Sequence, residues 1–180
     1  MGLLEPVSQQ GPTRIPIDHC FDVKGVGTVI LGKVAQGEVK NYDKLKLWPK
    51  GVEVLIKSIQ MHDDPVEEAL SPARVGLAVK GVTPDDIQRG DQLGEEGSVQ
   101  LAQDIAINYL HNKFFKEKLA ENQTFLASIG LQIRAAKITS LSPMKLSLNK
   151  PVAFDRNDIC VILKPESQTI RIVGSGTIVL

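Results

Sequence analysis

The chain has 180 residues, a formal net charge of zero and a hydrophobic share of 42%, which allows one large domain or two small ones with ordinary cores. A net charge of zero argues against a strong, nonspecific nucleic-acid binder. No apolar run approaches the roughly 20 residues of a membrane-spanning helix, and the N-terminus lacks the features of a secretory signal, so we expect a cytoplasmic protein with no membrane partner.

The charge is distributed unevenly along the chain. Residues 1–98 carry 11 Lys or Arg and 15 Asp or Glu, a net −4, whereas residues 99–180 carry 10 and 6, a net +4. This asymmetry suggests two units, of which the second is better suited to a phosphate backbone. An excess of four charges is also modest enough to arise by chance.

Strand signals dominate the first half. Residues 1–12 end in Gln-Gln-Gly-Pro and predict a linker or a frayed terminus. Beyond them, alternating apolar residues are interrupted by Gly, Asn and Asp turns, a pattern of short strands and hairpins. We expect strands within residues 21–34, 38–48, 52–61, 73–82 and 86–94. Such spacing is typical of a closed all-β unit, here residues 13–98.

The second half of the sequence shows the same pattern of short strands and turns. A Gly-Glu-Glu-Gly-Ser stretch at residues 94–98 marks the boundary before a second barrel at residues 99–180. Residues 112–121 are good helix formers but could equally form a mobile basic loop, and both alternatives stay open. The G-x-G-T pattern of residues 25–28 recurs at 174–177, a weak echo that suggests a similar turn in each unit. Further strands are expected within residues 125–141, 145–155, 158–164 and 169–180. The predicted fold class is all-β, with two antiparallel barrels in tandem and little helix.

Residues 27–34 come one residue short of a phosphate-binding loop. They read Gly-Thr-Val-Ile-Leu-Gly-Lys-Val, whereas the motif G-x-x-x-x-G-K-[ST] ends in a hydroxyl residue that binds Mg²⁺. The β-branched Thr28, Val29 and Ile30 favour extended backbone. No helical period follows to supply the amides that hold phosphates. We therefore interpret this stretch as a strand.

Other catalytic or metal-binding patterns are weak. Residues 62–68 hold one His and four carboxylates, but no second His lies at ligand spacing and Pro65 indicates a solvated loop. The nucleophile pattern G-x-S-x-G does not occur. Cys20 and Cys160 lie far apart and are expected to be free thiols rather than a disulfide. We predict no catalytic residue and no metal site.

Three stretches carry a family resemblance. Residues 15–45 contain F-x-V-x-G-x-G-T-V-I-x-G-x-V, residues 56–93 contain V-G-L-x-V-K-G-V-x-x-x-D-I-x-R-G, and residues 150–180 end in G-x-G-x-I. Together they resemble the second and third domains of translational GTPases such as elongation factor Tu, over nearly the whole chain from about Thr13. Residues 58–69 and the C-terminal end are most similar to the archaeal selenocysteine-specific elongation factor and its paralogues.

The resemblance implies two antiparallel barrels with different roles in binding a transfer RNA. The first barrel would hold the aminoacyl end against a GTPase domain, with a pocket formed by Asp18, His19, Gln60, Met61, His62 and Arg74. The second would grip the T-stem backbone through Lys113, Lys116, Lys118, Arg134, Lys137, Lys145 and Lys150. For these basic residues the alternative is a solvated surface. His19 stands where the selenocysteine factors have an Arg, which leaves selenocysteine specificity open.

The resemblance does not include a GTPase domain. The chain has no phosphate-binding loop and no N-K-x-D base-reading motif. We therefore expect no cofactor in this chain, since GTP and Mg²⁺ would belong to a missing GTPase domain. The chain is either part of a larger factor or a free-standing two-barrel protein. Residues 3–6 read like a helix end before an interdomain linker, which favours the first explanation.

The implied function is the tRNA-binding half of an elongation-factor-like translation GTPase, without enzymatic activity of its own. Its expected partners are aminoacyl-tRNA, a GTPase domain in cis or in trans and the ribosome, and we expect a monomer. The alternative is a protein-interaction module that docks on another translation factor or on the ribosome, which the neutral charge and the acidic first barrel suggest. The two-barrel gamma subunit of the archaeal initiation factor that delivers initiator tRNA matches residues 58–69 less well.

Overall fold

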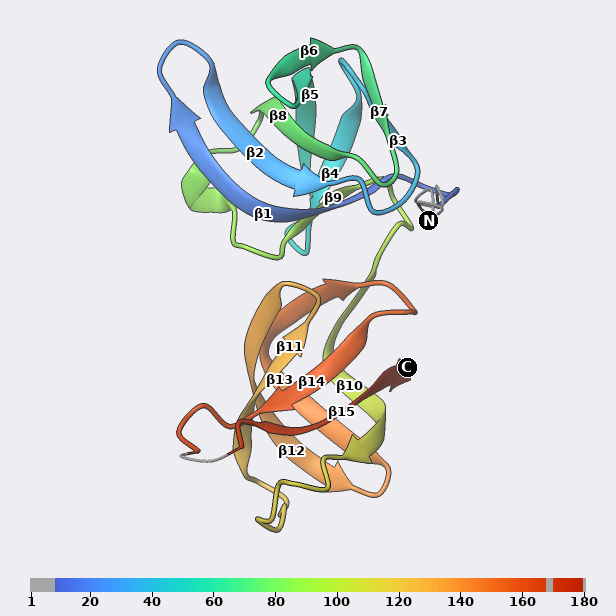
Figure 1. Ribbon diagram of the computed structural model, residues 1–180, viewed down its shortest axis with the longest axis vertical. Helices are drawn as coiled ribbons and strands as arrows, with labels where there is room; N and C mark the ends of the chain where they lie inside the picture. The colour runs from blue at the N-terminus through green and yellow to red at the C-terminus, as the bar shows by residue number, and fades with distance from the viewer. Residues whose placement is uncertain (1–8, 168–169, 180) are drawn as a thin grey trace, which may run out of the picture. The chain divides into compact units, whose positions relative to one another are not determined.

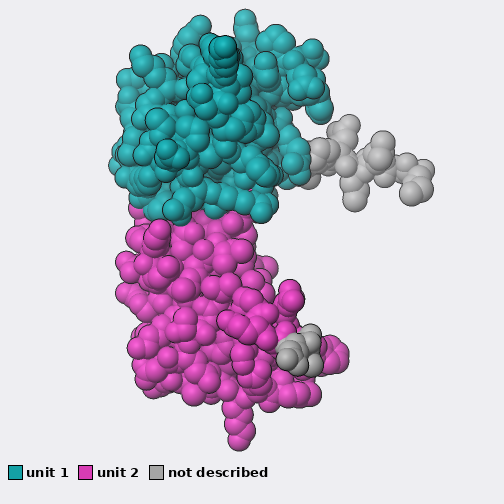
Figure 2. Space-filling model, turned by 90° about the vertical axis from the view of Figure 1, so that its left-hand side faces the viewer, with its two compact units in different colours: residues 1–99 teal, residues 100–180 magenta. Residues whose placement is uncertain are grey.

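The computed structural model describes residues 9–167 and 170–179. The chain forms two compact units, residues 1–99 and 100–180 (Figure 2). Within the described ranges the only helix is a short 3-10 turn, η1 (Pro84–Asp86). The prediction of an all-β fold with two barrels is confirmed. Residues 1–8 of the predicted linker, including the proposed helix end at residues 3–6, lie outside the described residues.

The first unit is a barrel that closes through its fourth strand. The hydrogen-bonded order is β4-β9-β1-β2-β8-β5-β6, and β4 also pairs with β5, so that the first six strands of this order form a ring (Figure 1). β3 and β7 form a separate two-stranded sheet. The bounds are β1 (Arg14–Val23), β2 (Gly27–Lys33), β3 (Glu38–Lys40), β4 (Lys44–Trp48), β5 (Val52–Met61), β6 (Asp64–Val66), β7 (Glu68–Leu70), β8 (Arg74–Lys80) and β9 (Gln92–Gly94).

The β1–β2 hairpin contains the near-miss phosphate loop. Its turn is entered and left through Gly25 and Gly27, at φ 85° and 94°, a backbone region that glycine adopts without a Cβ clash. β2 then runs as a strand paired with both β1 and β8, and Val34 beyond its end is fully buried. The element that comes next after β2 is the strand β3, not a helix. The interpretation of residues 27–34 as a strand is confirmed.

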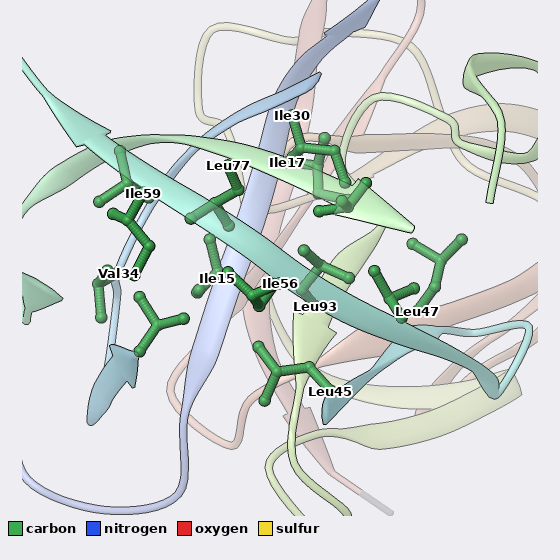
Figure 3. Packing of buried hydrophobic residues seen from close by; sticks show 14 of the residues in the cluster. Ile15, Ile17, Ile30, Val34, Leu45, Leu47, Ile56, Ile59, Leu77 and Leu93 are labelled. Carbon is green, nitrogen blue, oxygen red and sulfur yellow. The ribbon is translucent and has the colours of Figure 1, made fainter. Parts of the chain in front are cut away.

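The core of the first unit consists of aliphatic side chains that alternate along the strands. Ile15, Ile17, Leu47, Leu77 and Leu93 are all fully buried and converge from four strands (Figure 3). Alternation arises because successive side chains of a strand point to opposite faces. Full burial of each such side chain is worth about 1.5–3 kcal/mol. Burial therefore determines which side chains of each strand point into the barrel, and the residues between them face outward.

The second unit is a closed six-stranded barrel of order β10-β13-β12-β11-β14-β15. Its core includes the fully buried Phe154, Ile138 and Cys160. Burial raises the pKa of the Cys160 thiol to about 12. Both cysteines are free, as predicted, and each lies in a different unit. The strands are β10 (Gln100–His111), β11 (Thr124–Ile129), β12 (Gln132–Leu141), β13 (Met144–Phe154), β14 (Ile159–Leu163) and β15 (Ile172–Val179).

Residues 112–121 form a loop, so the helical alternative was wrong and the loop alternative was right. Tertiary contacts override the local helix propensity here. Phe115 is buried in the core of the second barrel, and its backbone oxygen lies 2.9 Å from Nε2 of His111. The Asn112 amide donates to the Ile172 oxygen at 2.8 Å. These anchors hold the segment in an irregular path beside β10 and β15.

The second G-x-G-T pattern plays a different role from the first, so the prediction of a similar turn in each unit was wrong. Gly174 and Gly176 lie inside β15, between β10 and β14. A Cβ atom would come within 2.4 Å of the Tyr109 ring at Gly174 and within 2.3 Å of the Asn108 oxygen at Gly176. Close packing, rather than a turn, requires these glycines.

The segments that lead into and out of the first barrel are joined to each other. The Thr13 amide donates to the Glu95 carboxylate at 2.9 Å, and the Glu95 amide donates back to the Thr13 oxygen at 3.1 Å. The Ser98 hydroxyl donates to the Glu95 oxygen at 2.7 Å. Residues 94–98 are thus hydrogen-bonded into the first unit immediately after its last strand.

We predict that Leu77→Ala lowers the free energy of unfolding of the first unit by about 2–5 kcal/mol, because it leaves a cavity in a fully buried position. The matched control is Leu70→Ala, at a residue that is 50% exposed, with an expected change within about 0.5 kcal/mol. Urea unfolding of both variants measures the difference. Equal losses would contradict the assignment of Leu77 to the core.

Candidate functional site

Most of the predicted pocket residues lie on the outer face of the first barrel. Strand register places His19, Leu31, Gly76 and Gln60 in one line across β1, β2, β8 and β5, called here the His19–Gln60 row. Since adjacent strands lie about 4.8 Å apart, the row spans roughly 14 Å. Two strands, β2 and β8, thus lie between the two predicted residues at its ends.

Gly76 leaves an open position in the middle of this row. A Cβ atom there would only just touch its neighbours, at 3.5 Å from Leu31 and 4.0 Å from Gln60. Leu31 is 39% exposed beside it. The row therefore combines an apolar side chain, a bare backbone stretch and an amide, which suits a flat ligand with polar edges.

A second row of outward residues runs alongside. Phe21, Val29, Ala78 and Ser58 are paired one after another across the same four strands, although Ala78 is only 7% exposed. Phe21 is 42% exposed and presents an aromatic ring, a group on which nucleobases stack. The sequence prediction missed Phe21, Leu31 and Gly76, although strict alternation from the buried Ile30 identifies Leu31 as outward.

The remaining pocket residues gather at one end of the face. Met61 pairs with Asp64 at the tip of the β5–β6 hairpin, where His62 and Asp63 adopt φ values of 53° and 70°. Arg74 begins β8 and pairs with Lys33. The β5–β8 register, which ends at Gln60 and Gly76, brings Arg74 to the same end as His62. Gln60, His62 and Arg74 thus lie at one end of the face, whereas Asp18 and His19 lie across it. Met61 is half-buried and packs against the core instead.

Asp18 lies in an irregular part of β1 and is held by two basic side chains. The β1–β2 register shifts between Ile17 and His19. Nε and Nη2 of Arg89 lie 3.0 and 2.9 Å from Oδ1 of Asp18, and Nδ1 of His19 lies 3.2 Å from Oδ2. Desolvation raises the pKa of Asp18, but the hydrogen bond from Arg89 and the charges of His19 and Arg89 together hold it below its usual value.

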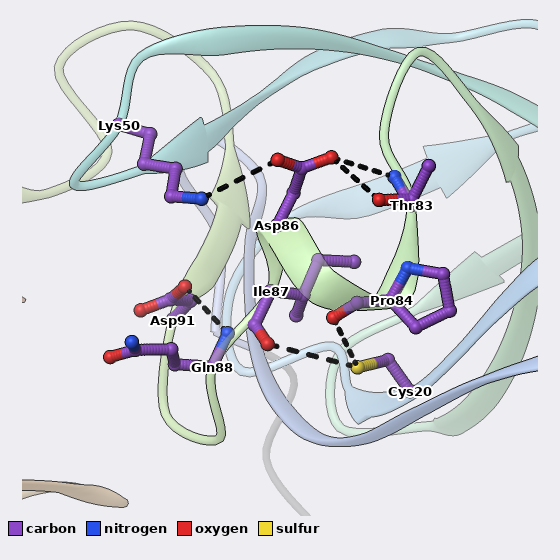
Figure 4. Close-up of polar contacts among 8 residues, drawn as sticks. All are labelled: Cys20, Lys50, Thr83, Pro84, Asp86, Ile87, Gln88 and Asp91. Atoms are coloured by element: carbon purple, nitrogen blue, oxygen red, sulfur yellow. Dashed lines mark hydrogen bonds and ion pairs between the residues drawn. The ribbon is translucent and has the colours of Figure 1, made fainter.

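The loop that carries Arg89 is firmly attached to β1. Its turn closes through the Gln88 amide, which donates to the Asp91 carboxylate at 2.9 Å (Figure 4). The Gly90 amide donates to the Ile17 oxygen at 2.8 Å, and the Ile17 amide to the Asp91 oxygen at 2.9 Å. Arg89 is therefore presented beside Asp18 although 71 residues separate them in the chain.

Six of the seven predicted backbone-binding residues of the second barrel are exposed. Lys113, Lys116 and Lys118 lie in the loop after β10, and Lys137, Lys145 and Lys150 lie on β12 and β13. Nζ of Lys113 lies 5.0 Å from the centre of the exposed Phe114 ring. Arg134 is only 8% exposed and donates to the Ile133 oxygen, so a phosphate contact would require it to leave this position.

An uncharged surface occupies another side of the second barrel. Strand register aligns one residue from each of β10, β15, β14, β11 and β12, and we call this row the apolar face. Its members, in that order, are Leu110, Ser175, Val161, Ser128 and Ile133. Leu110 is 73% exposed and Ile133 is 54% exposed. Aliphatic residues also follow on either side along β14, at positions 159 and 163. This is the kind of surface that marks protein contacts.

No metal or membrane feature adds to these sites. Across residues 9–167 and 170–179, no three His, Cys, Asp or Glu side chains gather in a way that would hold a metal ion. In the same ranges no helix is long and apolar enough to cross a membrane.

Comparisons with known proteins agree with this architecture. Residues 27–94 match the family model of elongation factor Tu domain 2. The chain is 40% identical over 169 residues to an uncharacterised protein of Methanocaldococcus jannaschii, and 29% identical over 191 residues to the selenocysteine-specific elongation factor of the same organism. These alignments cover 92% of this chain and 54% and 41% of the relatives. The chain thus spans about half the length of the curated relatives that it matches along its whole course.

The solved structures give the same result for both barrels. The apo form of translation elongation factor SelB from Methanococcus maripaludis superposes with a TM-score of 0.85 at 26% identity, over 98% of this chain and 44% of that one. The resemblance to translational GTPases, restricted to their second and third domains, is therefore confirmed.

We predict that Gly76→Ala leaves the first barrel folded and raises its stability by up to about 1 kcal/mol, because the methyl group meets only ordinary contacts and restricts the unfolded chain. Gly32→Ala in the adjacent strand is the contrast, since its Cβ would lie 2.7 Å from the Pro16 oxygen. It should cost about 1–3 kcal/mol. Thermal unfolding compares them, and a strongly destabilised Gly76→Ala would refute the open position.

Proposed function

We propose that this chain, which carries the two β-barrels typical of the second and third domains of translational GTPases, is the tRNA-binding half of an elongation-factor-like protein in the cytoplasm. The observation that supports this most is the His19–Gln60 row, where three side chains and the bare backbone of Gly76 line a face suited to a nucleoside. Its length is comparable with that of a nucleoside joined to an amino acid.

The first barrel would bind the aminoacyl end. Phe21 and Leu31 offer apolar surface to the terminal base, and Gly76 lets the ribose approach the backbone closely. Beyond Gln60, the charged or polar groups of His62 and Arg74 would orient the ester and the amino acid through hydrogen bonds. The aminoacyl end of the RNA would thus be held by contacts at the edges of its terminal nucleoside and by stacking on the faces of the base.

The second barrel would bind the RNA backbone. Its exposed lysines carry the positive charge of the C-terminal half, and a lysine contacts a phosphate without reading the sequence. Such binding weakens steeply with salt because counterions are released. The chain has no residues for GTP hydrolysis in the family's manner, so in this proposal a GTPase domain, in cis or in trans, completes the pocket and controls delivery to the ribosome.

The test is charge reversal of Lys113, Lys116 and Lys137 together, measured as affinity for aminoacyl-tRNA against salt concentration. We expect a loss of about tenfold or more in low salt and a shallower salt dependence, because about three phosphate contacts are removed. Reversal of Lys24, Lys44 and Lys50 of the first barrel changes the net charge equally and serves as control. Equal affinities of the two triple variants would refute the proposed surface.

A second function is favoured by the apolar face of the second barrel. An exposed Leu and an exposed Ile at the two ends of an uncharged row have no role in binding phosphates. In this alternative the chain is an interaction module that docks on the ribosome or on another translation factor through aliphatic contacts. Such docking would resist salt, unlike the binding of RNA by lysines.

We predict for this alternative that Leu110→Lys with Ile133→Lys abolishes salt-resistant co-sedimentation with ribosomes, because two charges would be buried on docking. Leu101→Lys, at a residue of the same barrel that is 45% exposed but outside the apolar face, should retain it. Binding that disappears in high salt for the unmodified chain would exclude this function.

A further inference from the structure

We propose that Phe114 is a stacking platform for an unpaired nucleobase, and that the second barrel therefore prefers RNA in which a base projects from the duplex over an uninterrupted duplex. This inference rests on the proposed function and deepens it, because it adds a feature of the RNA to a surface that was predicted to contact the backbone alone. The sequence prediction selected lysines in the loop between β10 and β11 but not the Phe among them (Figure 1).

The loop presents the Phe114 ring to solvent from a fixed backbone. Phe114 is 60% exposed, whereas the next residue, Phe115, is buried in the core of the barrel. The Phe114 amide donates to Oδ1 of Asn112 at 3.1 Å, and Nδ2 of Asn112 donates to the Ile172 oxygen of β15 at 2.8 Å. Because Phe115 takes the inward position and Asn112 ties the turn to β15, the fold itself holds the ring of Phe114 outward.

Positive charge accompanies this ring along the same loop. Nζ of Lys113 lies 5.0 Å from the ring centre, and Nζ of Lys116 donates to the Lys113 oxygen at 2.9 Å. The only acidic residue between Lys113 and Lys118 is Glu117, and its carboxylate is paired with Lys164 beyond the end of β14. A nucleotide carries a flat base next to a phosphate, and the loop offers an aromatic ring next to ammonium groups.

These charges distinguish the Phe114 ring from an anchor for a protein partner. Lysines are depleted from the centres of protein interfaces, and the apolar face of the same barrel has no charged residue in its row. Every base has a π face, so that stacking on the ring would select an unpaired base without selecting its identity. The bases of an uninterrupted duplex stack on one another and are not available to the ring.

Binding of two RNA probes to the full chain tests the proposal. One probe is a blunt RNA duplex, and the other is the same duplex with one unpaired 2-aminopurine at its centre. We expect the unmodified chain to bind the second probe about fivefold or more tightly than the first, because an aromatic side chain contributes that much per stacked base. Phe114→Ala should bind both probes with the lower affinity, whereas Phe114→Trp should keep the preference. Fluorescence anisotropy measures the affinities, and quenching of the 2-aminopurine on binding, which Phe114→Ala should lose, reports the stacking.

The matched control is Leu101→Ala, which removes an exposed apolar side chain at the opposite end of β10. It should keep the preference for the unpaired base, and thermal unfolding should find every variant folded.

Equal affinity of the unmodified chain for the two probes would overturn the inference and leave the proposed function standing, because contacts to the backbone need no unpaired base. An undiminished preference in Phe114→Ala would overturn it as well. If Phe114→Ala instead kept its RNA affinities and lost salt-resistant co-sedimentation with ribosomes, the ring would belong to a protein contact. Failure of the unmodified chain to bind either probe would refute the RNA contacts of the second barrel in the proposed function, and this inference with them.

Discussion

Closure of the first sheet through β4 is the constraint on which the candidate site depends. Because β4 pairs with both β9 and β5, strands that are remote in the sequence are locked into one ring with one register. Because side chains alternate along each strand, the residues buried on the inner face of the barrel then determine which residues face outward. A shift of one residue in β8 would place Leu77 outside and Gly76 in the core, and the row from His19 to Gln60 would no longer exist.

Much of the fold could be predicted from the sequence because alternation and turn residues are local signals. Residues 27–34 were recognised as a strand, since β-branched residues and a following turn are incompatible with a helix-capped phosphate loop. The same local reasoning misread residues 174–177, where glycines pack against Tyr109 and Asn108 inside a strand. Local reasoning also could not decide between a helix and a loop for residues 112–121, because the buried position of Phe115 depends on contacts with the rest of the barrel.

The candidate site was less predictable than the fold. Family motifs indicated Gln60, His62 and Arg74, and the structure brings these to one end of the face. Pairing of Asp18 with Arg89 could not be read from a spacing of 71 residues, because it arises only when the loop before β9 docks on β1. Charge counting likewise treated Arg134 as available, whereas inward alternation along β12 buries it.

The mutual hydrogen bonds of Thr13 and Glu95 bring the start and the end of the first barrel together. A domain with adjacent termini can be inserted into a loop of another protein with little disturbance to either fold. It can also be duplicated or lost as a unit, since the buried core residues that the structure describes in this unit run from Ile15 to Leu93. This geometry makes the barrel a transferable building block, able to appear in proteins of different length and domain order.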